Sequence, residues 1–255
     1  MRINHNITAL NNHRNMTLNN TTLAKNMEKL SSGLRINRAA DDAAGLAVSE
    51  KMRGQIRGLE QAQRNVQDGI SFVQTAEGAM NEISAMLVRM KELNVQIKNG
   101  TYSTDDRSNI EQELSQLGQQ ISMILNNTTF NGRKITDGVE IASDDKATII
   151  TIGSITTASF GSLTTASTLG DIEAAITAVA TERAKLGALQ NRLEYTSNNL
   201  GTTIENLSAS ESRIRDTDMA KEMVELAKNQ ILLQSSQAML AQANAAPQGV
   251  LSLLR

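Results

Sequence analysis

A seven-residue spacing of apolar side chains constrains this chain more than any other feature. Between residues 43 and 99, large apolar residues recur every seven positions, and a second apolar set falls between them. The first set is Met52, Leu59, Val66, Val73, Met80 and Leu87, and the second is Val48, Ala62, Ala76, Ile83, Met90 and Ile97. This heptad pattern predicts one helix of about 57 residues, roughly 85 Å long. A helix of that length must pack lengthwise against other helices.

Two further helices are predicted to complete this seam. Gly100 and Tyr102 interrupt the first helix, and Ser103 with Asp105 and Asp106 is typical of the start of the next one. The apolar residues of this second helix are three or four positions apart, and the helix should end near Asn126. They are Ile110, Leu114, Leu117, Ile121 and Ile124. A third helix should begin near residue 170 and run along the first two, because the heptad returns in Ile172, Val179, Leu186, Leu193, Leu200 and Leu207, with Ile176, Leu189 and Ile204 alongside.

Residues 130–168 have a different character. Asn131-Gly132, Asp137-Gly138 and the SDDK at 143–146 are turn signals, and ATIITIGSI follows them at 147–155. One or two small β-hairpins and a surface loop rich in Ser and Thr are predicted here. The predicted fold class is therefore mainly α: a long antiparallel coiled-coil-like helical bundle with a small hairpin region.

The two chain ends have opposite compositions. Near the N-terminus Ala9, Met16, Leu23 and Leu30 keep the seven-residue step, but nine Asn in the first 40 residues make an isolated helix marginal. Residues 219–246 instead carry a wide apolar arc: Met223, Val224, Leu226, Ile231, Leu232, Leu233, Met239 and Leu240. A paired N-terminal helix covers only part of that arc, so other copies of the chain must cover the rest. Self-assembly is the predicted consequence.

Composition and motifs argue against several function classes. The net charge is -2, and acidic and basic residues are interleaved along the chain, so the sequence predicts no basic patch that would bind nucleic acid. The sequence contains no run of 18 apolar residues, so no membrane span is predicted. The first residues, MRINHNITALNNHRNM, lack the apolar segment of a cleaved secretory signal. The spacing of His5 and His13 suits no metal site. The sequence places no histidine near a nucleophile and has no phosphate-binding loop. We therefore expect neither an enzyme nor a cofactor.

Four stretches resemble the core of bacterial flagellin, in that family's order. They are LSSGLRINRAADDAAGLAVSEKMRGQIRGL at 30–59, RMKELNVQIKNGTYS at 89–103, FNG at 130–132 and RIRDTDMAKEMVELAKNQILLQSSQAMLAQAN at 213–244. The resemblance implies a subunit of the flagellar filament, located outside the cell. It also implies that 1–42 and 212–255 pair as helices in an inner core domain, while 43–211 form an outer core domain. Only about 40 residues separate the second and third long helices, so the variable outer domains of larger members should be missing.

The resemblance makes the polar stretch after residue 30 a spoke between the two domains, with 211–218 (ESRIRDTD) as its returning strand. We hypothesise that opposite charges on the spoke pair within and between subunits and fix domain orientation. The charges are Arg35, Arg38, Asp41 and Asp42 on the outgoing side, and Arg213, Arg215, Asp216 and Asp218 on the returning side. Asp41 and Asp42 could also form a metal or acid–base pair, but adjacent carboxylates matched by arginines favour the structural interpretation.

Two surfaces are candidates for recognition. Inner-core polymerisation is predicted for Met223, Leu226, Ile231, Leu233 and Leu240. The second surface is Arg89 and Leu93, expected on a face away from buried Leu87 and Met90, with Glu113 beside them. By resemblance to flagellins that vertebrate Toll-like receptors detect, these three residues form a receptor-recognition site. A solvated face that packs between subunits is the alternative interpretation.

The resemblance also implies partners. Flagellins leave the cell through the flagellar type III apparatus, and a dedicated export chaperone wraps the C-terminal segment. A filament cap and hook–filament junction proteins are further partners. The alternative function is a soluble coiled-coil binding or signalling module, for which heptads would suffice. The apolar arc at 219–246 discriminates the two, because a module that works alone should not leave it uncovered.

Overall fold

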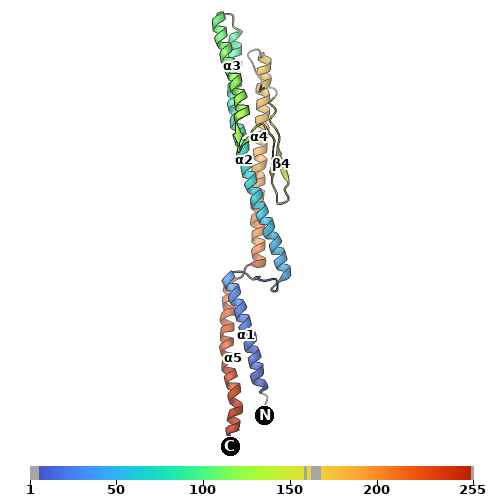
Figure 1. Ribbon diagram of the computed structural model, residues 1–255, viewed down its shortest axis with the longest axis vertical. Coiled ribbons are helices and arrows are strands. Elements are labelled where there is room, and N and C mark those ends of the chain that lie inside the picture. The colour runs from blue at the N-terminus through green and yellow to red at the C-terminus, as the bar shows by residue number, and fades with distance from the viewer. Residues whose placement is uncertain (1–5, 158–159, 162–167, 254–255) are drawn as a thin grey trace. The chain divides into compact units, whose positions relative to one another are not determined.

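The computed structural model describes residues 6–157, 160–161 and 168–253 (Figure 1). His5 and most of the predicted Ser/Thr loop lie outside these residues. The helices are α1 (Ile7–Ser32), α2 (Ala43–Ile97), α3 (Thr104–Asn127), α4 (Leu169–Arg215) and α5 (Met219–Leu253). Four short strands lie between α3 and α4: β1 (Thr129–Phe130), β2 (Arg133–Lys134), β3 (Val139–Ala142) and β4 (Ile149–Ile152). The predicted fold class, mainly α with a small hairpin region, is confirmed.

The chain divides into two compact units. We call residues 1–54 with 207–255 the terminal unit, and residues 55–206 the central unit. Both boundaries fall inside long helices, α2 and α4. The domain limits expected from the resemblance, at 42/43 and 211/212, stay a prediction.

Burial of the heptad residues produces the core of the central unit. The buried heptad residues of α2 are Leu59, Ala62, Val66, Val73, Ala76, Met80, Ile83, Leu87 and Met90. On α3 and α4 it includes Ile110, Leu114, Ile121, Ile172, Val179, Leu186, Leu193 and Leu200. Ion pairs join α2 to α4 beside this core, Lys91 with Glu173 at 2.9 Å and Arg183 with Glu77 at 3.7 Å. The predicted three-helix seam is confirmed within this unit.

The start of α3 follows the predicted chemistry. Ser103 accepts a hydrogen bond from the Asp106 N–H at 3.2 Å, and the Asp106 carboxylate accepts one from the Ser103 N–H at the same distance. These reciprocal bonds satisfy two helix N–H groups that have no partner inside the helix. They also hold the pKa of Asp106 below its usual value, chiefly through the Ser103 hydroxyl.

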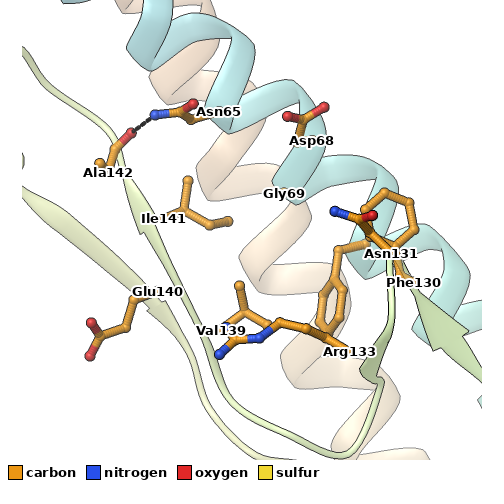
Figure 2. A pocket seen from close by; sticks show the side chains of 11 residues that line it. Asn65, Asp68, Gly69, Phe130, Asn131, Arg133, Val139, Glu140, Ile141 and Ala142 are labelled. Atoms are coloured by element: carbon orange, nitrogen blue, oxygen red, sulfur yellow. Dashed lines mark hydrogen bonds between the residues drawn. The ribbon is translucent and has the colours of Figure 1, made fainter.

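Two antiparallel hairpins form in the region where the turn signals predicted them. β1 pairs with β2 across Asn131 and Gly132, both of which have positive φ angles, and β3 pairs with β4. Ile141 of β3 lies close to α2 because the facing position there is Gly69 (Figure 2). A Cβ at Gly69 would overlap Ile141 Cδ1, so a larger residue there would force the Ile141 side chain to move.

A groove of about 660 Å³ opens where the hairpins meet α2 (Figure 2). The rings of Phe72 and Phe130 meet edge to face in its wall, with centroids 6.0 Å apart. Asn65 donates a hydrogen bond to the Ala142 carbonyl at 3.3 Å. These contacts attach both hairpins to α2.

Candidate assembly surfaces

The returning part of the spoke is shorter than predicted. Residues 211–215 are not a strand, because α4 stays helical through Arg215. Only 216–218 lie between α4 and α5, and Asp218 begins α5 by accepting hydrogen bonds from the N–H groups of Ala220 (3.0 Å) and Lys221 (3.2 Å). The segment ESRIR contains no helix breaker, so α4 continues until Asp218 provides the cap of the next helix.

Backbone hydrogen bonds hold the two connections together. The Arg35 N–H donates to the Arg215 carbonyl at 2.7 Å, and the Thr217 N–H donates to the Gly33 carbonyl at 2.9 Å. The Arg35 guanidinium donates to the Ile214 carbonyl. Gly33, at φ 73°, ends α1 in the left-handed conformation, which glycine adopts without steric cost. The short bridge between the connections is therefore mainly backbone.

The charged side chains of the spoke pair locally. Arg35 lies 4.0 Å from Asp42, and Arg38 lies 2.9 Å from Glu28. Asp41 accepts hydrogen bonds from the N–H groups of Arg38 and Asn37, and the Arg38 bond is the main cause of its lowered pKa. Arg213 donates to Ser210 at 3.0 Å. Within the described ranges, no ion pair joins the outgoing set of four charges to the returning set, whereas pairing between subunits stays a prediction.

Two residues that sequence reasoning missed complete this connection. Glu50 of α2 lies 2.7 Å from the largely buried guanidinium of Arg215, whose hydrogen bond is the main cause of the lowered pKa of Glu50. Ile36 is fully buried, and a Cβ at Gly45 would come within 2.9 Å of its Cδ1. Glu50 resembles an ordinary surface partner of Arg53, three residues on, so its spacing carried no signal. Ile36 was the one large β-branched residue of a polar stretch, which could have marked it.

The chain ends pair as predicted. α1 and α5 lie side by side in the terminal unit (Figure 1) and run antiparallel: Asn6 bonds the Ala243 carbonyl at 2.7 Å, and Lys29 lies 3.9 Å from Glu222. Of the side chains described in the two helices, only Asn26 and Asn229 are buried. The apolar residues of the seam are only half-buried, so this pair has no enclosed core.

The predicted polymerisation residues occupy two different places. Leu226, Leu233 and Leu240 are half-buried in the seam with α1. Met223 and Ile231 are 55% and 65% exposed. Further exposed apolar side chains accompany them on α5, namely Met219, Val224, Leu232 and Met239. One copy of the chain therefore leaves much of the apolar surface of α5 in water.

The predicted receptor residues are only partly brought together. Arg89 Nη2 lies 3.0 Å from Glu113 Oε1, and Nη1 lies 3.2 Å from Glu92 Oε2. Hydrogen bonds from Arg89 to Glu113, and then to Glu92, raise the pKa of Arg89. The expectation that Leu93 faces away from the core was wrong, because Leu93 is 1% exposed.

The reason lies in the neighbours of α2 near its end. An ion pair to Glu113 on one side and another to Glu173 on the other show that both α3 and α4 pack here. Two neighbouring helices bury a wider face than the two-position stripe of a simple heptad. Leu93, three residues after buried Met90, falls inside that wider face.

The described residues contain neither a metal-binding cluster nor a membrane-spanning helix. No three His, Asp or Glu side chains among them gather as they would around a metal ion. No described helix has both the length and the hydropathy of a membrane span.

Long antiparallel helices with a heptad core, paired chain ends and uncovered apolar side chains on α5 place the chain in the class of long, coiled-coil-like helical proteins. Residues 3–140 match the family model described as the bacterial flagellin N-terminal helical region, and residues 169–254 match the bacterial flagellin C-terminal helical region. The chain belongs to the bacterial flagellin family. Its members are structural proteins of the flagellar filament, so the chain is a filament subunit and not an enzyme.

Three relatives that align along their full length agree with this assignment over the whole chain. The flagellin of Bacillus subtilis (strain 168) is 49% identical and that of Halalkalibacterium halodurans 50% identical, each alignment covering 100% of both chains. The flagellar filament 33 kDa core protein of Treponema phagedenis is 48% identical with the same coverage. A crystal structure of Bacillus cereus flagellin is 31% identical, covers 56% of this chain and 88% of its own, and superposes with a TM-score of 0.42.

Proposed function

We propose that the chain polymerises into the extracellular flagellar filament through its terminal unit, whose apolar α5 surface neighbouring copies cover. The observation that carries this proposal is the exposure of α5: Val224 and Ile231 are 67% and 65% exposed, and none of the described apolar side chains of their helix is buried. Two helices that pack only against each other, with a seam that nothing else encloses, are only marginally stable in water. Packing by other copies therefore supplies the missing stabilisation.

The alternative, a soluble coiled-coil signalling module, fits this surface poorly. A protein that works as a dilute monomer gains nothing from large apolar side chains in water, and such surfaces promote association. The central unit alone, with its buried heptad core, would satisfy that alternative. The terminal unit would not.

Limited proteolysis separates the two functions. In dilute monomer we expect the protease to trim about 40 residues from each end and to leave a resistant core near 43–211, because the terminal unit opens at low cost. In assembled material the same ends should survive. Mass spectrometry of the fragments identifies the cut sites. If the ends of the monomer resisted the protease as strongly as the core, the result would favour the soluble module.

The same α5 surface supports proposed partners before assembly. Apolar side chains exposed in the cytosol would aggregate, so we propose that an export chaperone covers α5 until the chain enters the flagellar type III apparatus. The filament cap and the hook–filament junction proteins would meet the same terminal unit at the two ends of the polymer. Co-purification of such a chaperone should require residues 219–246.

We further propose that Arg89 and Glu113 form part of a surface read by a vertebrate Toll-like receptor. The exposed ion-paired cluster of Arg89, Glu92 and Glu113 supports this, since fixed guanidinium and carboxylate groups suit recognition by hydrogen bonds. Arg89→Asp should reduce the potency of monomer in a receptor-reporter assay by roughly tenfold or more.

The control for this assay is Arg64→Asp. Arg64 is another exposed arginine of α2, and its guanidinium bonds Gln61 on the same helix. It should leave potency unchanged. Equal potency of the Arg89→Asp variant and the parent chain would remove Arg89 from the site.

A further inference from the structure

The seam between α1 and α5 alternates polar and apolar layers. The α1 positions that follow the seam spacing and are half-buried or buried are Ala9, Asn12, Met16, Asn19, Leu23, Asn26 and Leu30, so every second seam residue from Asn12 on is asparagine. Glu28 and Lys29, next to Leu30, are also half-buried. On α5 the matching positions are Glu222, Leu226, Asn229, Leu233, Ser236, Leu240 and Ala243. Asparagine therefore recurs every seven positions on α1, and Glu222, Asn229 and Ser236 recur with the same spacing on α5. The two polar sets meet at Asn26 and at Asn19.

The polar layer at Asn26 is the most enclosed of these. Asn26 is 5% exposed and Asn229 is 7% exposed. In the amide orientation that satisfies both its nitrogen and its oxygen, Asn26 donates to the Thr22 carbonyl of its own helix at 3.0 Å and to Glu222 Oε1 at 3.1 Å. Its amide oxygen accepts a hydrogen bond from Asn229 Nδ2 at 3.0 Å. We call Asn26, Asn229 and Glu222 the polar cluster. Its members satisfy one another across the seam.

The other two asparagine layers have longer and more accessible hydrogen bonds. Asn19 lies 3.4 Å from the Ser236 hydroxyl, and Asn12 donates to the Met239 carbonyl, also at 3.4 Å. Both asparagines are half-buried, so water can replace a lost partner there. The polar cluster is therefore the layer at which a change of partner would cost most.

The opposite face of α5 is a competing position for α1. Residues two positions from a seam residue lie about 200° around a helix, which places Val224, Ile231 and Ala238 opposite the seam. Val224 and Ile231 are more exposed than any leucine of the seam, so an apolar α1 could cover this face as well. The polar residues of the face are also spaced by seven: Lys228, Ser235 and Gln242.

This competing face suits Asn26 poorly. At its level the polar residue is Lys228, whose ammonium group only donates hydrogen bonds and already pairs with Glu225 at 3.3 Å. An Asn26 placed there would keep the Thr22 carbonyl and could accept a hydrogen bond from Lys228, but its second amide N–H would lose the Glu222 acceptor, a costly change for a group shielded from water. Ser235 and Gln242 could still serve Asn19 and Asn12. The two faces therefore differ most at the polar cluster.

We propose that the polar cluster determines which face of α5 the N-terminal helix covers. The need of Asn26 for an acceptor on α5, in addition to the Thr22 carbonyl of its own helix, directs α1 to the face with Glu222 and Asn229. In the same way, a polar residue at a seam position specifies alignment in coiled coils at a cost in stability. The face with Val224 and Ile231 stays free. Its use by neighbouring copies rests on the proposed function, whereas the choice of face is a property of one chain.

Disulfide trapping in the full-length chain tests the proposal. The chain has no cysteine, so an introduced pair carries the only thiols. Met16→Cys with Leu240→Cys reports the observed face, and Met16→Cys with Ala238→Cys reports the opposite face at the same level of the helix. Dilute monomer is oxidised, and the intramolecular product is measured on a non-reducing gel. When Asn26 and Asn229 are unchanged, we expect the 16–240 disulfide to form in larger amount than the 16–238 disulfide.

Replacing Asn26 and Asn229 together by leucine should remove most of this preference. The ratio of 16–240 to 16–238 product should fall by at least about fivefold, because no enclosed layer then requires a polar partner. Asn15→Leu with Asn20→Leu, the same change at exposed positions of α1, should leave the ratio unchanged. Asn26→Ser should keep it high, because a hydroxyl can still donate to Glu222 and accept from Asn229.

An unchanged ratio in the leucine variant, or equal trapping of both pairs in the parent seam, would overturn the proposal. Neither result depends on whether the chain polymerises. The proposed function fails separately, if the parent chain forms no filaments.

Discussion

Val224→Glu combined with Ile231→Glu abolishes polymerisation under conditions in which the parent chain assembles fully. Both side chains are about two-thirds exposed and lie on the face of α5 opposite its seam with α1. If neighbouring copies cover this face, each added subunit must bury two unpaired carboxylates, at a cost of about 3 kcal/mol or more. That cost raises the critical concentration by roughly a hundredfold or more. Sedimentation of polymer across a concentration series measures it.

The matched control is Val224→Leu with Ile231→Leu, which keeps the face apolar and should assemble close to the parent concentration. Thermal unfolding of the monomeric glutamate variant should match that of the parent chain, because exposed positions contribute little to the fold of one copy. Normal filaments from the glutamate variant would mean that this face stays in water in the polymer, and the proposed assembly surface would be wrong.

Leu93→Ala lowers the free energy of unfolding of the central unit by about 2–5 kcal/mol, the usual cost of truncating a buried leucine. Leu93 is 1% exposed and lies where α2 meets both α3 and α4. Denaturant unfolding of monomer, followed by circular dichroism, measures the loss. Val95→Ala on the same helix is the control, since Val95 is 54% exposed and should change stability by less than about 0.5 kcal/mol.

This result also decides how Leu93 could influence receptor recognition. A buried side chain makes no direct contact with a partner, so a Leu93→Ala variant should lose potency only to the extent that the central unit loosens. If Leu93→Ala left stability unchanged while potency fell, Leu93 would instead be exposed in the recognised state, contrary to its place in the core.

The sequence by itself determined the features that depend on local spacing. The seven-residue repeats of α2 and α4 placed the helices and most of their buried residues, because a helix brings every third and fourth residue to one face. Ser103 and Asp106 marked the start of α3, and Asn131-Gly132 marked the first hairpin turn, because these residue types satisfy helix N–H groups or adopt positive φ. The contrast between an Asn-rich first segment and an apolar last one indicated that the ends pair and remain partly uncovered.

Only the tertiary structure decided the features that depend on which neighbour covers a residue. Leu93 is buried because two helices flank α2 at that point, and Val48 is 45% exposed although the heptad includes it, because no described part of the same copy covers it. Glu50 meets Arg215 from 165 positions away in the chain. The leucines at 226, 233 and 240 face α1, whereas Ile231 faces water, although all four belong to one apolar arc in the sequence. Hydropathy measures what a side chain prefers, and only the placement of other segments determines whether that preference is met.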